Sequence, residues 1–424
     1  MKPKELKKII KDGALSKYSH LYSDIKGQTE RFIKAIDSFT KLYGQERDIS
    51  IFSVPGRSEI SGNHTDHNNG CVLAGSIDRD IIAIAAKSDA NKVNVKSEGY
   101  PLDTVELSDA DKPEKFKKFT SSALIGGMIG GFMKRGEAVG GFDAYLTSDV
   151  LKGSGLSSSA AYEVMIGNIL NHLYSDGRVE NANIAVIAQY AENLYFGKPC
   201  GLMDQIACAV GGFVYIDFEN PTSPVIEPIK FSLADAGYTL CIVNTRGNHA
   251  DLNDDYAAVP GEMKTVAKLL GRDVLRGLTE EEIIKNFSNI RRVAGDRAIL
   301  RSLHFMRENK RVARIREALK RGDTEGFLKA VSESAKSSFQ YLQNVYTPSD
   351  VREQGLSVAL ALSDGYLEGK SAVSRVHGGG FAGTVQTFLK TEDAEGYVGY
   401  MNSVFGDGAC EPFNVRPDGA VKLF

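Results

Sequence analysis

The sequence predicts a protein of mixed α and β structure with two or three domains, and three observations carry this expectation. The chain has 424 residues, whereas a single domain usually takes about 100 to 200. In the first half, short β-branched and aromatic runs alternate with segments of helical period. Between about residues 252 and 364 the period is almost wholly helical, so we expect a helix-rich second domain that starts near residues 225–240.

The elements are expected in the following order. Residues 1–45 have the pattern of polar helices. Residues 51–54 form a β-branched and aromatic run, and we expect this strand to stop at Pro55-Gly56 and to lead into a loop. Helical patterns follow near residues 112–134, 158–174 and 183–196. Further strands are expected at residues 81–86, 93–95, 142–146, 213–216, 238–243, 372–376 and 384–389.

Composition excludes several classes of protein. Apolar residues make up 42% and charged residues 25%, which is the balance of a globular chain rather than a disordered or collagen-like one. The 51 basic and 54 acidic residues give a net charge of −3, so the whole chain has no electrostatic attraction to nucleic acid. We therefore expect a small-molecule ligand and no nucleic-acid partner.

Cysteine spacing and hydropathy predict the compartment. The five cysteines are odd in number, widely spaced and without a CxxC pair, which is typical of neither a disulfide framework nor a zinc ribbon. The N-terminal segment is charged throughout, and the longest strictly apolar run, residues 81–86, is far shorter than the ~20 residues that span a bilayer. We expect a cytoplasmic protein with no membrane partner.

A basic stretch at residues 291–321 raises the question of a nucleic-acid surface. It carries eleven Lys or Arg residues against three acids. Apolar residues recur in it at helical spacing, among them Ile299, Leu303 and Met306. We therefore expect its charges to lie on the solvated outer faces of helices that pack on a core.

A Gly- and Ser-rich loop at residues 151–161 runs into an apolar helical pattern and suits an anion. Glycines let the backbone approach a phosphate, and the free N–H groups and dipole of a helix start attract it. The segment is neither a Walker loop nor a complete GxGxxG. The alternative is that Ser157 only caps the helix. The residues expected at the phosphate are Gly153, Ser154, Gly155, Leu156, Ser157, Ser158, Ser159 and Ala160.

Two further segments carry hydrogen-bonding groups or unusual backbone freedom. Residues 55–70, PGRSEISGNHTDHNNG, suit a polyhydroxylated ligand with a phosphate or carboxylate near Arg57. A metal site of His64, Asp66 and His67 is the alternative there. Residues 377–383, HGGGFAG, have four glycines in the six positions that follow the histidine, more than a plain turn needs. An α/β-hydrolase would place HGGG before its nucleophile, whereas here it follows the serine loop, which disfavours that class.

Together the three segments, in this order and spacing, resemble the motifs of the GHMP small-molecule kinases, and the galactokinase family most closely. The segments PCGLMDQ at 199–205 and ALKRGD at 318–323 are also similar. This resemblance implies a ribosomal-S5-like α/β domain, which we place at residues 1–230 with 1–40 as a helical extension, and a ferredoxin-like domain at 231–424, with the site in the cleft between them. It also implies transfer of the ATP γ-phosphate to the anomeric hydroxyl of galactose, with Mg²⁺, by a monomer or homodimer.

The resemblance also implies roles for individual residues. Asp204 matches the base that takes the sugar's anomeric proton, and Arg57 matches the cation beside it; a helix-starting acid without a catalytic role is the alternative for Asp204. The Mg²⁺ ligands would be Ser158 or Ser159 with Glu192. The positions that match sugar contacts are Asn63, His64, Asp66, Gly201 and Tyr256, and Gly379 and Gly380 are expected at the nucleotide.

Two departures from the family pattern concern the substrate. Asn63 stands where galactokinases typically have a glutamate that reaches the sugar's 6-hydroxyl, and His67 replaces a tyrosine. Losing the charged acceptor weakens one hydrogen bond by ~1 kcal/mol. A glutamate about 4 Å from a C6 carboxylate would repel it by roughly 4 kcal/mol. A galacturonate or similar sugar 1-kinase is therefore an alternative to galactokinase, and a non-catalytic sugar sensor is another.

Overall fold

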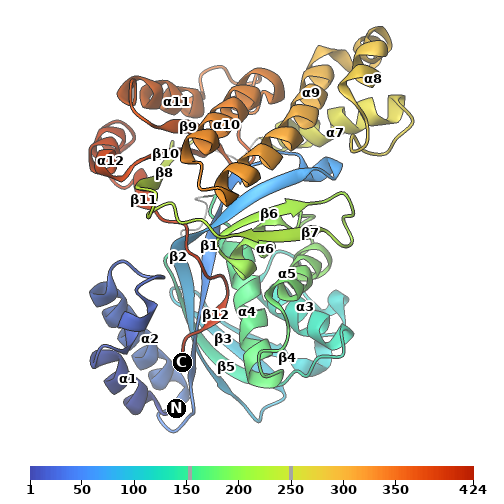
Figure 1. The fold of residues 1–424 in the computed structure, drawn as a ribbon. Helices are drawn as coiled ribbons and strands as arrows, with labels where there is room; N and C mark the ends of the chain where they lie inside the picture. Colours follow the sequence, from blue (N-terminus) through green and yellow to red (C-terminus); the bar gives the residue numbers. More distant parts are fainter. Residues whose placement is uncertain (151–154, 248–251) are drawn as a thin grey trace. The chain divides into compact units, whose positions relative to one another are not determined.

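A computed structural model describes residues 1–150, 155–247 and 252–424 of the chain. Its contacts divide the protein into two compact units. Figure 1 shows the chain coloured along its sequence. The first unit comprises Met1–Arg57, Ser76–Gly212 and Arg416–Phe424, and the second comprises Ser58–Gly75 and Phe213–Val415. These units are discontinuous in sequence, unlike the expected domains 1–230 and 231–424, and that division into family domains stays a prediction.

The first unit is built on a mixed sheet in the order β12-β1-β2-β5-β3-β4. Strands β3 and β5 pair in parallel, while β2 and β5 pair antiparallel. The last strand, β12, pairs with β1, so the C-terminal tail belongs to this unit. The strands are β1 (Ser50–Ser61), β2 (Cys71–Lys87), β3 (Lys92–Ser97), β4 (Leu102–Glu106), β5 (Phe142–Ser148) and β12 (Val421–Lys422).

The expectation that the first strand stops at Pro55-Gly56 is wrong, because β1 continues to Ser61. The backbone N–H of Arg57 donates to the carbonyl of Leu156 at 3.1 Å, so the strand keeps a partner beyond the proline. Gly56 permits this approach, since a Cβ there would lie 2.8 Å from the same carbonyl oxygen. This close packing places Arg57 beside the serine-rich loop.

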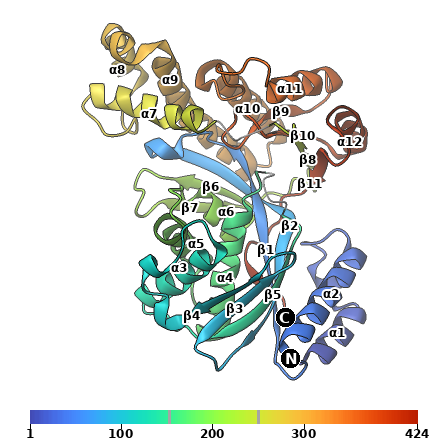
Figure 2. The same ribbon diagram turned by 180° about the vertical axis from the view of Figure 1, so that it is seen from behind.

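Helices lie on the two faces of the first unit's sheet, as Figure 2 shows. The first two helices lie on one face, and α3 to α6 lie on the other. The helices are α1 (Pro3–Lys11), α2 (Ile25–Tyr43), α3 (Ser121–Lys134), α4 (Ser158–Tyr174), α5 (Asn181–Tyr190), the π-helical turn Ala191–Phe196 and α6 (Met203–Val210). Short 3₁₀ turns are Ala14–Tyr18, Leu107–Asp109 and Pro113–Lys115.

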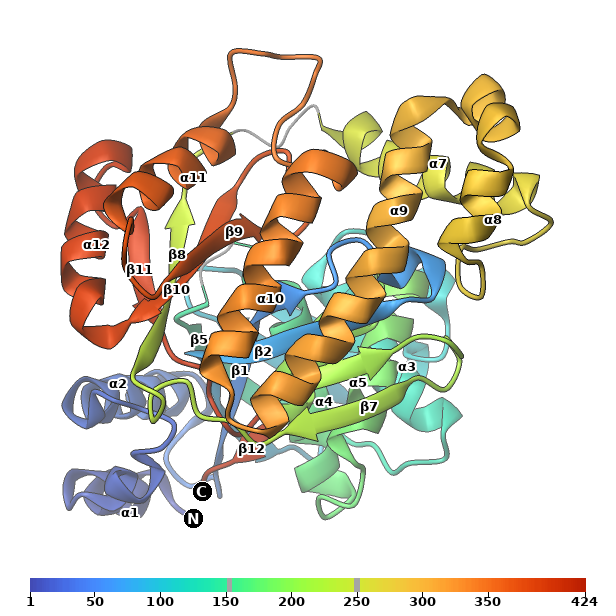
Figure 3. The same cartoon turned by 45° about the horizontal axis from the view of Figure 1, so that its top comes forward.

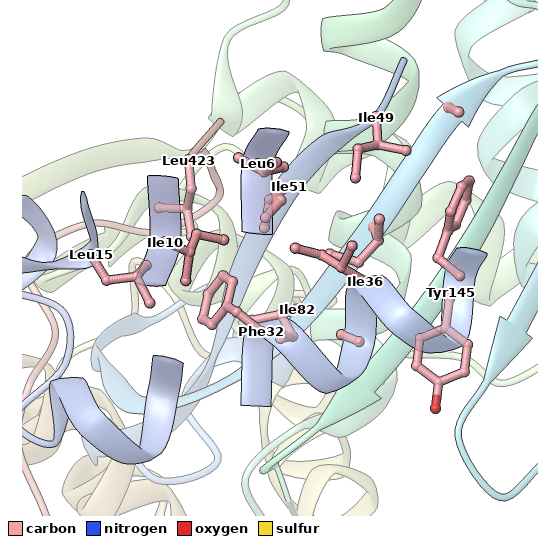
Figure 4. Close-up of a cluster of buried hydrophobic side chains, with 14 of the residues drawn as sticks. Leu6, Ile10, Leu15, Phe32, Ile36, Ile49, Ile51, Ile82, Tyr145 and Leu423 are labelled. Carbon is pink, nitrogen blue, oxygen red and sulfur yellow. The ribbon is translucent and has the colours of Figure 1, made fainter. Parts of the chain in front are cut away.

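The helical extension at the N-terminus is an integral part of the first unit. Its apolar side chains, among them Leu6, Ile10 and Phe32, pack against Ile51 and Ile82 of the sheet (Figure 4). These helices have a polar sequence overall, but their buried stripes build a core.

A buried carboxylate adds polar contacts between the extension, the sheet and the C-terminal tail. Asp80 accepts hydrogen bonds from Arg31 at 2.6 Å, Tyr22 at 2.7 Å and Arg416 at 3.2 Å. Tyr22 and Arg31 belong to the extension, Arg416 to the C-terminal tail and Asp80 to β2, so this carboxylate joins three segments of the first unit.

The second unit contains an antiparallel sheet in the order β11-β8-β10-β9 and a set of helices of which α9 and α10 lie side by side (Figure 3). The start of β2, Cys71–Gly75, pairs with β6. The strands are β6 (Phe213–Asp217), β7 (Val225–Ile229), β8 (Tyr238–Asn244), β9 (Val373–His377), β10 (Thr384–Lys390) and β11 (Cys410–Phe413). The helices are α7 (Asn253–Leu269), α8 (Glu280–Lys285), α9 (Phe287–Lys320), α10 (Thr324–Ser337), α11 (Gly355–Tyr366) and α12 (Thr391–Phe405), with a 3₁₀ turn at Asp66–Asn68 and a π-helical turn at Ser338–Leu342.

The basic stretch lies in α9, and the expectation that its charges are all on solvated faces is partly wrong. Arg301, Glu308 and Arg311 are buried. Arg311 donates to Glu308 at 2.6 Å, and Glu308 also accepts from the backbone N–H of Gly62 at 3.0 Å. Buried charges of this kind require partners, and here they tie α9 to the polar segment at 58–70.

Among the helices that the structure describes, none combines the length and apolar character needed to cross a membrane.

The buried stripe of the extension gives a stability prediction. Phe32 is fully buried, whereas Leu42 on the same helix is 49% exposed. We expect Phe32→Ala to destabilise the protein by about 3–5 kcal/mol through lost burial and a cavity, and Leu42→Ala to change stability by less than about 1 kcal/mol. Thermal and urea unfolding of the two variants would test this, and equal effects would contradict the packing of the extension.

Candidate active site

The first unit brings Arg57 and Asp204 into a bidentate ion pair. Arg57 Nε donates to Asp204 Oδ1 at 2.7 Å, and Nη2 donates to Oδ2 at 2.8 Å. Asp204 is the second residue of α6, and Arg57 lies in β1. The arginine side chain is 9% exposed and the aspartate side chain 33%, so the carboxylate remains accessible to a ligand. The planar guanidinium matches both carboxylate oxygens, which fixes their orientation.

The surroundings of Asp204 keep its carboxylate ionised. Burial alone raises its pKa, but the charge and hydrogen bonds of Arg57 and a hydrogen bond from Ser157 bring the pKa below its usual range. Lys198 adds a smaller effect in the same direction. A helix-starting acid without another role needs no such partners, so the surroundings favour a chemical role for this carboxylate.

The serine-rich loop lies against the same pair. Arg57 Nη1 donates to the carbonyl of Gly155 at 2.5 Å. Ser157 adopts a left-handed conformation, with φ 56° and ψ 53°, and its hydroxyl donates to Asp204 Oδ2 rather than capping α4. The alternative that Ser157 only caps the helix is therefore wrong.

The helix that follows the loop begins at Ser158. Its first turn includes Ser159 and Ala160. The backbone N–H groups of a helix's first turn have no hydrogen-bond acceptor within the helix. Leu156 is buried next to β1, which anchors the loop. The expected phosphate contacts Gly153 and Ser154 lie outside the described residues.

Glu192 belongs to a small cluster of buried polar groups. It lies in the π-helical turn that follows α5, a local geometry that is frequent at functional sites. Its Oε2 accepts from Gln205 Nε2 at 2.8 Å, and its Oε1 lies 3.4 Å from Lys198 Nζ. The same Gln205 amide donates to Glu163 at 3.3 Å. Burial, followed by the charge of Glu192, raises the pKa of Glu163 well above its ordinary value.

Sequence reasoning missed Glu163, Gln205 and Lys198. The signal for Glu163 was present, because it is the only acidic residue of α4 and lies within an apolar stretch of that helix. Gln205 follows the candidate base directly, but its role depends on the side chains that it contacts.

Oxygen donors near Glu192 suit Mg²⁺. Glu163 Oε1 and Gln205 Oε1 are buried and have no hydrogen-bond partner in the described structure. Among the described residues, no group of three or more His, Cys, Asp or Glu side chains is placed to hold a metal. Mg²⁺ is commonly bound by one or two protein oxygens together with water and substrate phosphates, so a site with few protein ligands fits this ion.

The expected sugar contact Asn63 is enclosed within the second unit. Its side chain is fully buried, and its Nδ2 donates to Glu59 Oε1 at 2.8 Å and to the carbonyl of Gly378 at 2.6 Å. Its Oδ1 accepts from Asn344 Nδ2 at 2.5 Å. Both amide hydrogens and the amide oxygen therefore have partners within the protein.

His64 has a partly exposed ring with one nitrogen available. Its Nε2 lies 2.8 Å from the carbonyl of Gly379, and because a carbonyl only accepts, Nε2 carries the hydrogen. Burial and the neighbouring His67 lower the pKa of His64 to about 4, so the ring is neutral near pH 7. Its Nδ1 can then accept a hydrogen bond from a ligand hydroxyl. Asp66 lies beside it, and its Oδ1 accepts from the backbone N–H of the exposed His67 at 2.9 Å.

Tyr256 joins the same set. Its hydroxyl donates to the carbonyl of Gly380 at 2.8 Å, which connects α7 to the glycine loop. A Cβ at Gly379 would lie 2.6 Å from the Tyr256 ring, and one at Gly380 would lie 1.9 Å from the carbonyl oxygen of Asn344. These close approaches explain why the loop is rich in glycine.

The predicted site residues therefore form two sets, each within one unit. Arg57, Gly155, Ser157 and Asp204 are in direct contact in the first. Asn63, His64 and Tyr256 meet Gly379 and its neighbours in the second. Gly201 lies just before Leu202, the residue that precedes α6.

Comparison with known proteins identifies the family. The family model for the GHMP kinases N terminal domain matches residues 123–212, and the galactokinase galactose-binding signature matches residues 37–87. A galactokinase of Streptomyces coelicolor is 30% identical over 87% of this chain and 92% of its own length. A galactokinase of Thermotoga petrophila is 32% identical over 79% of this chain and 88% of its own length.

Solved structures agree on the fold. The crystal structure of Lactococcus lactis galactokinase complexed with galactose has a TM-score of 0.76 at 22% identity and covers 91% of this chain and 98% of its own. The Methanococcus jannaschii mevalonate kinase has a TM-score of 0.60 at 17% identity, over 87% of this chain and 98% of its own. The chain has the α+β GHMP kinase fold, and it belongs to the galactokinase family of the GHMP kinases.

Proposed function

We propose that the protein transfers the γ-phosphate of ATP to the anomeric hydroxyl of galactose and so forms galactose 1-phosphate. The observation that carries this proposal is the ionised, partly exposed carboxylate of Asp204, which Arg57 holds beside the serine-rich loop at the start of α4. Membership of the galactokinase family supports the choice of reaction.

Asp204 is proposed as the base. Its Oδ1 accepts one hydrogen bond from Arg57, which leaves a lone pair for the sugar's anomeric hydroxyl. Its lowered pKa keeps it in the proton-accepting form, but also makes it a weak base. A weak base suits a loose phosphoryl-transfer transition state, in which the proton leaves as the new oxygen–phosphorus bond forms.

Arg57 is proposed to act on charge and on geometry. Its guanidinium offsets the negative charge of Asp204 and would also offset the charge on a transferring phosphoryl group. Its bond to the carbonyl of Gly155 fixes the loop relative to the base.

The start of α4 is proposed to bind the nucleotide phosphates. The N–H groups of its first turn and its dipole attract anions, and Ser158 and Ser159 supply hydroxyl oxygens there. Glu192, with Ser158 or Ser159, would hold Mg²⁺, and Gln205 orients the Glu192 carboxylate. When bound, Mg²⁺ would neutralise charge on the phosphate oxygens.

The sugar is proposed to bind through His64, Asp66, Gly201 and Tyr256. The neutral ring of His64 offers a hydrogen-bond acceptor at Nδ1, and the carboxylate oxygens of Asp66 are further acceptors. Sugar hydroxyls need such paired donors and acceptors. The proposal requires that the bound sugar presents its anomeric hydroxyl to Asp204.

A sugar 1-kinase for galacturonate is a second candidate. It is suggested by the neutral amide of Asn63, but that amide is enclosed and bonded within the protein. Glu59 still places a carboxylate in contact with that amide, although Arg375 lies 3.7 Å from it and offsets its charge. We therefore keep galactose as the proposed substrate.

Substrate choice can be tested with a panel of sugars. Purified protein with ATP and Mg²⁺ should phosphorylate galactose with a higher kcat/KM than galacturonate, N-acetylgalactosamine or arabinose, as measured by coupled ADP release. Faster turnover of galacturonate would replace the proposed substrate. If no sugar of the panel releases ADP, a sugar-sensing role would replace catalysis.

The role of Asp204 gives a separate prediction. We expect Asp204→Asn to lower kcat by about 10²–10⁴, the usual contribution of a positioned base. The amide keeps the size of the side chain, so unfolding temperature and nucleotide affinity serve as controls for structure. Activity within about threefold of the wild type would exclude Asp204 as the base.

A further inference from the structure

Three consecutive carbonyls of the glycine loop each accept a hydrogen bond from a side chain that sequence reasoning assigned to the sugar. Asn63 donates to Gly378 at 2.6 Å. His64 donates to Gly379 at 2.8 Å, and Tyr256 donates to Gly380 at 2.8 Å. All of these residues belong to the second unit. We call this set of three bonds the carbonyl clamp.

The three donors differ in what remains available for a ligand. His64 keeps Nδ1, whereas the Tyr256 hydroxyl uses its hydrogen on the carbonyl of Gly380. Asn63 keeps no free hydrogen, because its second N–H bonds Glu59 and its oxygen accepts from Asn344. The side chain of Asn63 is also fully enclosed.

The position of Asn63 selects for an amide. Its nitrogen lies between two acceptors, Glu59 Oε1 and the carbonyl oxygen of Gly378, so only a donor fits there. A carboxylate at this position would face both acceptors without a proton to share. Arg375 lies 3.7 Å from Glu59 and offsets the charge of that acid.

The backbone around Asn63 is also held in place. His304 Nε2 donates to the carbonyl of Asn63 at 3.0 Å, and the N–H of Gly62 donates to Glu308 at 3.0 Å. Burial lowers the pKa of His304 to about 4, so it is a neutral donor at this nitrogen. The peptide that carries the amide is therefore fixed from α9.

We infer that Asn63 is a positioning residue, which holds the glycine loop through the carbonyl clamp and does not read the C6 substituent of the sugar. This inference corrects the expectation that Asn63 contacts the sugar and favours a C6 carboxylate. Only the kinetic consequence of this inference rests on the proposed function, because the carbonyl clamp is a property of the fold.

The first test needs no activity. Asn63→Asp exchanges the amide nitrogen for an acceptor at nearly constant volume. Hydrogen–deuterium exchange of peptides covering residues 377–383 should be at least about tenfold faster in this variant, because the loop opens more readily. Asn289→Asp, on the exposed surface of α9, is the matched control and should leave the loop unchanged. Unchanged exchange in Asn63→Asp would overturn the inference.

The second test separates positioning from sugar contact. If Asn63 only positions the loop, Asn63→Asp should lower kcat/KM for galactose and galacturonate by the same factor, within about threefold. If residue 63 touched C6, the new charge would shift the ratio toward galactose by about tenfold or more, at 1.4 kcal/mol for each factor of ten. Such a shift would overturn the inference. If the wild type is inactive, the proposed function is wrong. The hydrogen-exchange experiment would still test the carbonyl clamp.

A second variant covers the case in which Asn63→Asp does not fold. Tyr256→Phe removes only the hydroxyl that bonds Gly380 and keeps the aromatic ring. Exchange at residues 377–383 should again increase, by at least about threefold. If the loop stays equally protected in this variant, the clamp does not hold it and the inference fails.

Discussion

The ion pair between Arg57 and Asp204 is the interaction on which the proposed chemistry depends. A buried arginine is stable only with a partner, and a carboxylate in this environment stays ionised only beside a cation. The same guanidinium bonds the carbonyl of Gly155, and the same carboxylate accepts from Ser157. The ion pair therefore orients the Asp204 carboxylate, keeps it ionised and holds the adjacent loop in place.

The second unit applies a different constraint to the glycine loop. The carbonyls of Gly378, Gly379 and Gly380 each accept a hydrogen bond from Asn63, His64 or Tyr256, and a partly buried acceptor gains stability from such a partner. Glycine is needed at Gly380 because the backbone of Asn344 lies too close for a Cβ. The glycine loop, which the sequence predicts as a ligand-binding loop, therefore also connects parts of the second unit through its backbone.

Sequence patterns predicted the interior strands and the helical second half well, because these depend on local period. They did not predict that β1 continues through Pro55, since its partner there is a loop about a hundred residues away. The burial of Glu308 and the enclosure of Asn63 likewise depend on partners that the tertiary fold supplies. A residue type indicates which hydrogen bonds a side chain can make, but not whether its partner is the protein or a ligand.

The pH dependence of kcat/KM in the wild type and in Arg57→Gln tests the central claim most directly. Arg57 lowers the pKa of Asp204 against the effect of burial, so removing its charge should raise the acid limb by one pH unit or more, with a smaller shift in Arg57→Lys. ATP titrates identically in each assay, so a difference between the pH profiles of the three proteins comes from a group of the enzyme. An acid limb at the same pH in all three proteins would contradict the account.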